Sequence, residues 1–498
     1  MALIQITDLT FTYPGSFDPV FEHVSFQLDT DWRLGLTGRN GRGKTTLLRL
    51  LQGQYPHQGT ITAPGGFEYF PYPIPDAALT PLELLECSFP DVPQWRLRRE
   101  LAPLFVTDDA LYRPFSTLSG GEQAKILLAL LFAREGRYLL IDEPTNHLDE
   151  TGRALVSRYL AKKSGFLLVS HDRAFLDGCV DHILSINRGG IEVQKGNFSS
   201  WYENRQRQDA FELAQNAQLK KEIGRLKQAA RQSRAWADKV ENTKIGPHSA
   251  KVTGEADAMG GRAYIGEQSR RMQQRRKNLE RRQNAAIEEK SALLKNIEQA
   301  APLKLHQLPY HTDRLALLRD VSVCYGGAPV CRGVSFCVEQ GDRIALRGAN
   351  GTGKTSLLRL LCGEDVPHTG TVERSSRLRI SYVRQDPSGL RGDLSAYAAR
   401  YGLDESLFKA ILRKLDFARV QFEKDMADFS AGQKKKVLLA RSLCEPSHLL
   451  VWDEPLNYVD VLSRMQIEDL LLEFQPTIVF VEHDRVFCDH VATKAVML

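Results

Sequence analysis

Two segments of this 498-residue chain have the residue types and spacing that bind nucleotide phosphates. Residues 38–46 and 348–356 each follow the pattern glycine, four residues, then Gly-Lys-Thr. In such a loop the glycines let backbone N–H groups surround the phosphates. The lysine reaches the β- and γ-phosphates, and the next hydroxyl holds Mg²⁺. The expected nucleotide contacts are Gly38, Asn40, Gly41, Gly43, Lys44, Thr45, Thr46, Gly348, Asn350, Gly351, Gly353, Lys354, Thr355 and Ser356.

An Asp-Glu pair stands at the end of an apolar strand in each half of the chain. Successive side chains of a strand point to opposite faces. The aspartate of each pair is therefore expected to bind a metal or its water shell, and the glutamate to face an attacking water. The alternative is that each pair only caps a turn. The candidates are Asp142, Glu143, Asp453 and Glu454.

The spacing of these motifs shows an internal duplication. Matched positions lie 310 to 312 residues apart: Lys44 and Lys354, Ser119 and Ser430, Glu143 and Glu454, His171 and His483. Because the offset drifts by only two residues, the halves are one domain duplicated. We assign the domains to residues 1–200 and 302–498, with residues 201–301 as a linker.

The linker carries the basic character of the chain. Residues 203–300 hold 21 Lys and Arg against 13 Asp and Glu, a net charge of +8, while the whole chain is +5. Its apolar residues form two narrow stripes: Leu219, Ile223, Leu226 and Ala230, then Leu279, Ala286, Leu293 and Ile297. Narrow stripes of this kind predict coiled-coil-like helices. Glycines and a proline interrupt the segment between them. We expect a long antiparallel helical hairpin with an irregular tip near residues 240–265.

The hairpin has two interpretations. Charge runs are most often solvated spacers. A spacer, however, needs neither a matched return helix nor a dense arginine cluster, and such a cluster suits a phosphate backbone. The candidate contacts to RNA are Lys244, Lys251, Arg262, Arg270, Arg271, Arg275 and Arg276.

Composition excludes several classes of protein. The chain is 42% hydrophobic and 26% charged, which is ordinary for a soluble protein. No apolar run approaches the roughly 20 residues of a membrane span, and no signal peptide is visible. Its eight cysteines form no C-x-x-C pair, which argues against a disulfide framework or structural zinc. We expect a cytoplasmic protein.

The motif order carries a resemblance. A phosphate loop is followed by Leu118–Gln123 (Leu-Ser-Gly-Gly-Glu-Gln) or Phe429–Gln433, then by the Asp-Glu pair and a single histidine. This order resembles that of ABC ATPase cassettes. Two cassettes joined by a helical linker look like the ABC-F class, and the resemblance covers essentially the whole chain. It implies an α/β fold of two phosphate-loop cassettes joined by the hairpin.

The resemblance also implies roles for residues. Each ATP would lie between one phosphate loop and the signature of the opposite cassette, with Lys44 facing Ser430 and Lys354 facing Ser119. Tyr13 and Tyr325 would stack on adenine, although an ordinary strand aromatic is the alternative. Glu143 and Glu454 would act as general bases, and His171 and His483 would sense the γ-phosphate. The implied signature contacts are Ser119, Gly120, Gly121, Glu122, Ser430, Ala431, Gly432 and Gln433. The implied Mg²⁺ ligands are Thr45, Asp142, Thr355, Gln385 and Asp453.

The halves depart from each other at several of these positions. Gln385 stands in the metal-contacting loop of the second half, whereas Tyr72 takes that place in the first. A phenol cannot act as an amide does. The second signature has Ala431 for glycine, and Leu456 and Glu482 replace Thr145 and Ser170. We therefore expect both sites to bind ATP and to work unequally.

The chain has no room for the extra arm that some ABC-F members insert before the first signature, and it ends fifteen residues after His483. Within the family it looks most like the Lsa-type ribosome-protection group, which gives resistance to lincosamides, pleuromutilins and streptogramin A. The resemblance implies binding at the exit-tRNA site of the large ribosomal subunit, through rRNA, with the tip near P-site tRNA. Both cassettes are present in one chain, so a monomer can close on itself.

Three other functions use the same cassette motifs. A housekeeping translation factor would rescue stalled ribosomes without any drug. The energy subunit of a membrane transporter would share the cassettes but gives no reason for a basic hairpin. A DNA-associated ATPase would use a basic arm on DNA.

Overall fold

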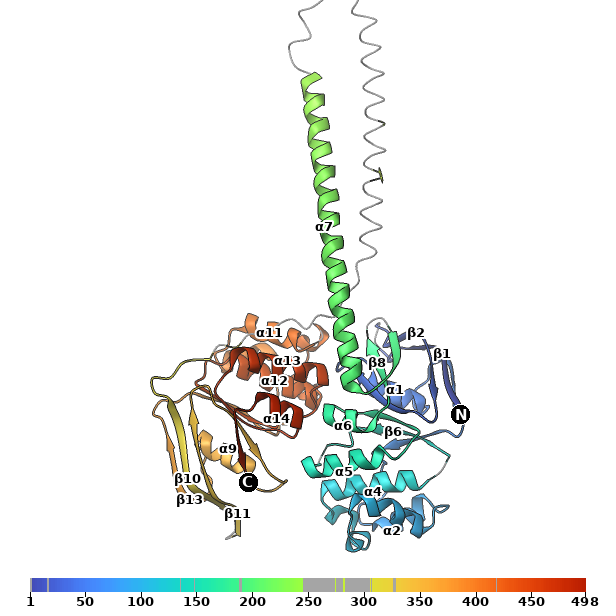
Figure 1. The fold of residues 1–498 in the computed structure, drawn as a ribbon, viewed down its shortest axis with the longest axis vertical. Coiled ribbons are helices and arrows are strands. Elements are labelled where there is room, and N and C mark those ends of the chain that lie inside the picture. The colour runs from blue at the N-terminus through green and yellow to red at the C-terminus, as the bar shows by residue number, and fades with distance from the viewer. Residues whose placement is uncertain are drawn as a thin grey trace, which may run out of the picture. The chain divides into compact units, whose positions relative to one another are not determined.

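The computed structural model describes residues 2–15, 18–134, 136–146, 148–187, 190–244, 274, 281–282, 305, 307–325, 328–417 and 419–498. The chain divides into two compact units. One comprises Met1–Trp201 with Ala300–Leu498, and the other comprises Tyr202–Gln299. The first unit contains both cassettes, and the second contains most of the linker (Figure 1).

Cassette one is built on a six-stranded sheet in the order β5-β6-β7-β3-β8-β9, parallel except for β9, beside a three-stranded antiparallel sheet in the order β2-β1-β4. The strands are β1 (Leu3–Phe11), β2 (Phe21–Asp29), β3 (Arg33–Gly38), β4 (Gln58–Thr62), β5 (Phe67–Phe70), β6 (Tyr138–Asp142), β7 (Phe166–Val169), β8 (His182–Asn187) and β9 (Gly190–Lys195). The helices are α1 (Lys44–Leu51), α2 (Pro81–Ser88), α3 (Gln94–Leu101), α4 (Gly120–Ala133), α5 (Glu150–Leu160) and α6 (Arg173–Cys179).

Cassette two repeats this topology. Its five-stranded parallel sheet has the order β14-β15-β16-β12-β17, and its antiparallel sheet has the order β11-β10-β13. The strands are β10 (Arg314–Tyr325), β11 (Ala328–Glu339), β12 (Arg343–Arg347), β13 (His368–Arg374), β14 (Ile380–Val383), β15 (Leu449–Asp453), β16 (Ile478–Val481) and β17 (Lys494–Met497). The helices are α9 (Lys354–Cys362), α10 (Leu394–Arg400), α11 (Glu405–Lys414), α12 (Ala431–Cys444), α13 (Val461–Phe474) and α14 (Arg485–Val491). The matching strand orders confirm the α/β fold with two cassettes.

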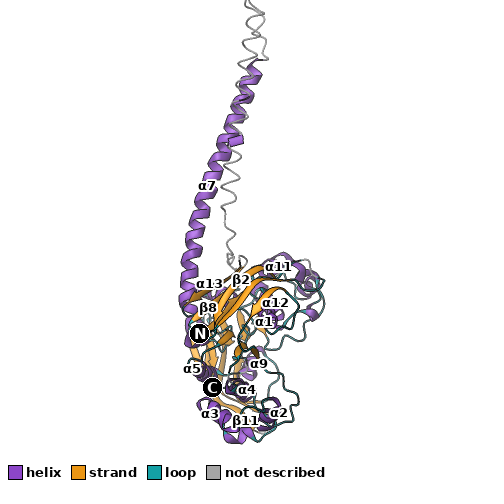
Figure 2. Cartoon of the chain, turned by 90° about the vertical axis from the view of Figure 1, so that its right-hand side faces the viewer, coloured by secondary structure: helices purple, strands orange, loops and turns teal. Residues whose placement is uncertain are grey.

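Buried apolar runs determine which strands are central. Every residue of β7 is buried, as are the first four of β6 and all of β16. Strands that pack between helices need such continuous runs, and Figure 2 shows the strands and helices of the two cassettes in different colours. The antiparallel β1 instead alternates between buried and exposed residues over most of its length. The apolar segment 126–133 lies in α4, and seven of its eight residues are buried. The site residues therefore sit at the ends of rigid strands.

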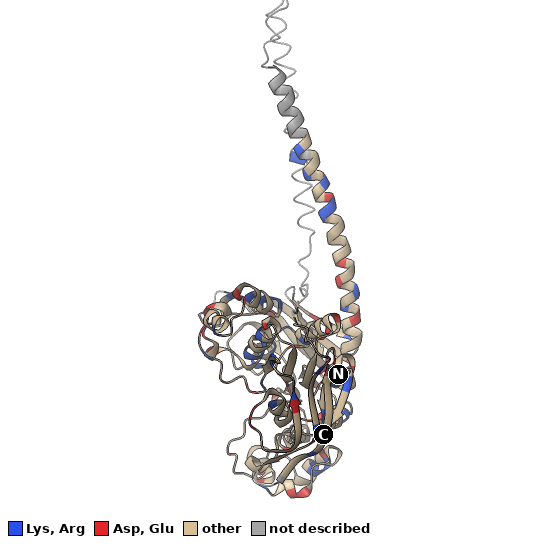
Figure 3. Ribbon diagram, turned by 90° about the vertical axis from the view of Figure 1, so that its left-hand side faces the viewer, with Lys and Arg blue, Asp and Glu red and all other residues tan. Residues whose placement is uncertain are grey.

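The linker begins with one long helix, α7 (Phe198–Lys244). Leu219, Ile223 and Leu226 are less exposed than their immediate neighbours, and Ile223 is buried, so the first predicted stripe is present as far as Leu226. Residues 220–231 hold five Lys and Arg against one Glu. Figure 3 marks Lys and Arg positions in blue along α7, with Asp and Glu positions in red among them. The second stripe and the tip beyond Lys244 lie outside the described residues, so the hairpin stays a prediction there.

Where the structure describes the chain, no helix has the length and apolar character needed to cross a bilayer.

Candidate functional site

The first phosphate loop joins β3 to α1. Gly43 caps α1 with a φ of 91°, and a Cβ there would lie 2.6 Å from the Val20 side chain. Only glycine meets both conditions. The Lys44 Nζ donates to the carbonyl oxygens of Gly38 at 2.7 Å and Arg39 at 3.3 Å. Burial lowers the pKa of Lys44. The loop thus encloses the Lys44 ammonium group, which donates to oxygen acceptors here and can donate to phosphate oxygens in the same way.

The second loop, between β12 and α9, has the same arrangement. The Lys354 Nζ donates to the carbonyl oxygens of Gly348 at 2.8 Å and Ala349 at 2.7 Å. Gly353 caps α9 with a φ of 85°. Both loops therefore lead into a helix N-terminus, where N–H groups and partial positive charge favour an anion.

An aromatic residue accompanies each loop. The Tyr13 hydroxyl is 2.7 Å from Thr46 Oγ1, and the Tyr325 hydroxyl is 3.0 Å from Ser356 Oγ. Tyr13 is 38% exposed and Tyr325 is 43% exposed, so neither is the buried strand aromatic that the alternative requires. Both rings are accessible beside the first turn of the helix. Stacking on adenine stays a prediction.

The Asp-Glu pairs stand where a sheet strand ends. Asp142 is the last residue of β6 and Asp453 the last of β15. Glu143 has a φ of 51° and Glu454 a φ of 46°. The left-handed region is unfavourable for glutamate, and such backbone persists where the surroundings enforce it, often at functional sites.

The two aspartates have different surroundings. Asp142 Oδ2 accepts a hydrogen bond from the Tyr69 hydroxyl at 2.9 Å. Both carboxylate oxygens of Asp453 are buried without a hydrogen-bond partner among the described residues, and burial raises the pKa of this carboxyl to about 6. A buried carboxylate without a partner is costly unless it binds a cation. The oxygen donors Asp453, Thr355 and Gln385 suit Mg²⁺.

No group of three or more His, Cys, Asp or Glu able to hold a metal occurs among the described residues. A cation at either site would therefore need oxygens from the nucleotide as well as from the protein. This is how Mg²⁺ is commonly bound, with one or two carboxylates and substrate phosphates.

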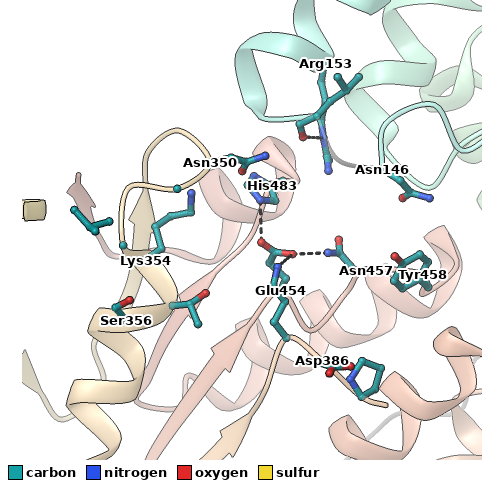
Figure 4. A pocket seen from close by; sticks show the side chains of 17 residues that line it. Asn146, Arg153, Asn350, Lys354, Ser356, Asp386, Glu454, Asn457, Tyr458 and His483 are labelled. Atoms are coloured by element: carbon teal, nitrogen blue, oxygen red, sulfur yellow. Dashed lines mark hydrogen bonds and ion pairs between the residues drawn. The ribbon is translucent and has the colours of Figure 1, made fainter. Parts of the chain in front are cut away.

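Glu454 is surrounded by hydrogen-bond donors (Figure 4). Its Oε2 accepts from Gln385 Nε2 at 2.8 Å and from Asn457 Nδ2 at 2.6 Å, and its Oε1 lies 3.2 Å from His483 Nε2. Burial raises the pKa of Glu454, but the hydrogen bonds from His483 and Gln385 outweigh it and bring the pKa to about 2. The carboxylate is ionised and held in one orientation.

Glu143 has fewer partners. Its Oε1 lies 3.3 Å from His171 Nε2, yet this oxygen is buried without a well-aligned hydrogen bond among the described residues. Burial and the neighbouring Asp142 raise the pKa of Glu143 to about 8. Burial also lowers the pKa of His171 well below its usual value, so the imidazole is neutral.

Strand register keeps Tyr72 at the place of Gln385, because Tyr69 and Tyr382 stand at matching positions three residues earlier, so its effect on site one stays a prediction. The Tyr72 ring packs against Phe89 with a centroid distance of 5.0 Å, and the phenol that reaches the site-one acid is Tyr69. Tyr69 pairs with Leu140 in the parallel register of β5 and β6. It therefore points to the same face as Asp142, two residues further along β6.

A cavity of about 340 Å³ surrounds Lys44 and is shared by both cassettes. Cassette two contributes Ser430, Ala431, Gly432 and Gln433, the residues that the sequence places opposite this loop. Asn40 Nδ2 donates to the Tyr458 carbonyl at 3.0 Å. A Cβ on Gly432 would lie 2.5 Å from the same carbonyl. Signature two thus meets the first loop within one chain.

A larger cavity of about 600 Å³ surrounds Lys354 and Glu454. Cassette one contributes Asn146, Leu148 and Arg153 to its lining, as Figure 4 shows for two of them. The described residues lining this cavity do not include Ser119, Gly120, Gly121 or Glu122, so the approach of signature one to Lys354 stays a prediction. Both signatures form a capping box at the start of their helix, with Ser119 N donating to Glu122 Oε2 and Ser430 N donating to Gln433 Oε1, each at 2.9 Å.

Several functional candidates were not found by sequence reasoning. Asn457 bonds to Glu454, and Tyr458 lines both cavities. The repeat offset offered a signal for Asn457, because Asn146 stands 311 residues before it. Lys436 lines the cavity around Lys44 as well.

The chain resembles several known proteins in sequence and in three-dimensional structure. The ABC transporter family model matches residues 21–68 and 331–457. The ribosome protection protein VmlR of Bacillus subtilis is 26% identical, over 99% of this chain and 87% of its own length. The ATP-binding protein Uup of Caulobacter vibrioides is 29% identical, over 96% of this chain and 75% of its own length. In three dimensions, the archaeal ribosome recycling factor aABCE1, crystallised with the stalk protein aP1, has a TM-score of 0.62 at 18% identity, covering 98% of this chain and 87% of the other.

The fold and the two sites thus define an ATP-binding protein with duplicated ABC cassettes. Over nearly its whole length the chain is similar to ABC-F proteins, and its ABC cassettes make it an ATPase.

Proposed function

We propose that this ATPase binds the large ribosomal subunit in its ATP-bound form and protects the peptidyl-transferase centre from antibiotics. The match to a ribosome protection protein carries the proposal, because it extends over 99% of this chain and so includes the linker. The basic side chains of α7 support it, since Lys and Arg on an extended helix suit a phosphate backbone.

The residues of each site have proposed roles. Lys44 and Lys354 hold the β- and γ-phosphates, while Asp142 and Asp453 hold Mg²⁺ with Thr45, Thr355 and Gln385. When bound, Mg²⁺ neutralises phosphate charge. Glu143 and Glu454 orient the attacking water and accept its proton. Of these two, only Glu454 is ionised and oriented by an amide donor in the structure, which supports unequal sites.

Nucleotide binding is coupled to ribosome binding through closure of the cassettes. Signature two already lines the cavity around Lys44, so a nucleotide there contacts both cassettes and favours the closed state. If only the closed state fits the ribosome, ATP and ribosome each increase the affinity for the other. Hydrolysis then weakens closure and releases the ribosome. In this proposal the closed protein occupies the exit-tRNA site, contacts rRNA through the linker, and brings residues 240–265 near P-site tRNA.

Purified ribosomes provide the test of the partner. Steady-state ATP hydrolysis is measured alone, with 70S ribosomes, with duplex DNA and with liposomes. We expect ribosomes to raise the rate of ATP hydrolysis, and we expect neither DNA nor liposomes to do so. Stimulation by DNA or liposomes alone would instead support a DNA-associated ATPase or a transporter subunit. Glu143→Gln with Glu454→Gln is the matched control, and it should abolish hydrolysis in every arm.

Antibiotic protection is tested separately from ribosome binding. A susceptible host expressing the chain is challenged with a lincosamide, a pleuromutilin and streptogramin A, and a higher inhibitory concentration is expected for at least one. Deleting residues 240–265 should remove this protection while ribosome-stimulated hydrolysis remains. Ribosome stimulation without any protection would favour the alternative of a housekeeping factor that rescues stalled ribosomes.

A further inference from the structure

Helix α12 contains a lysine that is fully buried although it lies inside a run of three lysines. Ser430 caps the helix, and residues 430–433 line the cavity around Lys44, which we call site one. Lys435 follows two residues later and is 0% exposed. A buried lysine is rare unless acceptors satisfy its ammonium group. Its acceptors therefore indicate what it does.

The acceptors of Lys435 belong to the cavity around Lys354 and Glu454, which we call site two. The Nζ donates to the carbonyl oxygens of Glu454 at 3.0 Å and Arg384 at 3.1 Å, and lies 3.5 Å from that of Asp453. Arg384 directly precedes Gln385, whose amide donates to the Glu454 carboxylate at 2.8 Å. Lys435 thus holds the backbone on both sides of the hydrogen bond that orients Glu454.

The neighbouring Lys436 has partners on the other side of the helix. Its Nζ donates to Asp460 Oδ2 at 3.1 Å and to the Leu415 carbonyl at 2.7 Å, and it lines site one. Helix α12 therefore lines site one with residues of its first turn. It contacts the catalytic loops of site two through Lys435. Both Lys435 hydrogen bonds are near optimal length, and a displacement of about 0.5 Å would bring them to the limit for a hydrogen bond.

Cassette one lacks this connection. Ala124 stands 311 residues before Lys435, and its methyl group can donate no hydrogen bond. The partner amide is missing as well, because Tyr72 stands where cassette two has Gln385 and packs on Phe89. Signature one consequently has no equivalent link to Glu143.

We propose that Lys435 is a positioning residue that couples nucleotide engagement at site one to the catalytic geometry of site two, and that signature one has no matching lysine to couple site two to Glu143. The inference rests on the proposed roles of Glu143, Glu454 and signature two, and it does not depend on the ribosome. A nucleotide that draws the start of α12 toward Lys44 sets the position of Lys435. Lys435 in turn sets the Gln385–Glu454 pair.

The test measures the burst of phosphate formation by the full-length chain at saturating ATP. In a Glu143→Gln background the burst reports site two. Lys44→Ala, which weakens nucleotide binding at site one, and Lys435→Met are introduced singly and together. Each alone is expected to lower the burst rate constant at least tenfold, with less than a threefold change in the ATP concentration that gives half the maximal rate. Together they should lower it no more than about twofold further, because they break the same connection.

A merely structural lysine predicts a different pattern, and either of two results would overturn the proposal. The first is that the reductions of the burst rate constant by Lys44→Ala and Lys435→Met multiply when the two changes are combined. The second is that Lys435→Met has a burst rate constant within twofold of that of its parent. Lys434→Met is the matched control on the same helix, since Lys434 donates to the Ala427 carbonyl and not to site two. It should leave the burst within twofold. Lys435→Arg, which keeps the donors, should recover most of the rate.

Two further variants keep the outcome interpretable. If Lys435→Met lacks a cooperative thermal transition, the same cycle is run with Lys435→Gln, and the same pattern of effects decides it. A burst that persists in Glu143→Gln with Glu454→Gln would show that the assigned glutamates are wrong, and the proposed function would fail with them. Loss of that burst together with multiplicative effects would reject the coupling alone.

Discussion

Gly432→Ala tests the contact between the cassettes at site one. A Cβ at this position would lie 2.5 Å from the Tyr458 carbonyl oxygen, whereas real Cβ atoms essentially never come closer than 3.0 Å. The carbonyl must therefore move by at least about 0.5 Å. That movement stretches its 3.0 Å hydrogen bond from Asn40 to the limit of bonding.

The expected magnitude follows from these two effects. Losing the hydrogen bond costs about 0.5–1.5 kcal/mol, and overpacking costs about 1–3 kcal/mol. A combined cost of about 2 kcal/mol corresponds to a roughly 30-fold loss. We expect Gly432→Ala to reduce site-one turnover by at least this factor in a Glu454→Gln background, where only site one hydrolyses ATP.

Gly389→Ala is the matched control, because a Cβ there meets nothing within 4 Å and the backbone is not left-handed. It should retain turnover within about twofold. Site-one turnover of Gly432→Ala equal to that of its parent would refute the contact between signature two, Tyr458 and Asn40.

Three further changes test other parts of the structure. Tyr69→Phe leaves a buried carboxylate oxygen of site one without its donor, so chemical denaturation should show a loss of about 1–3 kcal/mol in unfolding free energy; unchanged stability would contradict the contact. Arg173 and Glu468 form a buried ion pair between the cassettes, and a double-mutant cycle with alanine at each should give a coupling of at least about 1 kcal/mol; additive effects would argue against it. Arg270→Glu with Arg271→Glu should weaken ribosome binding and reduce the slope of log affinity against log salt by about 2, and an unchanged slope would exclude these residues from the phosphate contacts.

Sequence predicts most of this fold because the motifs occupy fixed places in it. The phosphate loops must join a strand to a helix, and the Asp-Glu pairs must end a strand. The duplication then requires the same sheet order twice, which the structure has. Glycine spacing and helix caps are local properties, so they can be read without knowledge of tertiary contacts.

Side chains that act through tertiary contacts escaped this reasoning. Tyr69 reaches Asp142 through the pairing of β5 with β6, and no local pattern indicates that contact. Lys435 belongs to a run of three lysines that reads as solvated, because the carbonyl groups that bury it come from loops 18 to 51 residues away in sequence.

The sequence also could not predict how far each phosphate loop lies from the signature of the opposite cassette. The sequence supplies both signatures and therefore suggests symmetry. Among the described residues, signature two lines the cavity of the opposite phosphate loop, whereas cassette one lines the other cavity with Asn146, Leu148 and Arg153. Which contacts form depends on the packing between cassettes, and no local pattern encodes it.

Sedimentation of a hydrolysis-deficient protein with ribosomes tests the central claim most directly. Glu143→Gln with Glu454→Gln should bind ATP and remain closed, so on a sucrose gradient with ATP it should migrate with the large ribosomal subunit and the 70S particle. Without nucleotide it should remain at the top of the gradient. Recovery of this variant at the top of the gradient in saturating ATP would contradict ATP-driven binding of the ribosome.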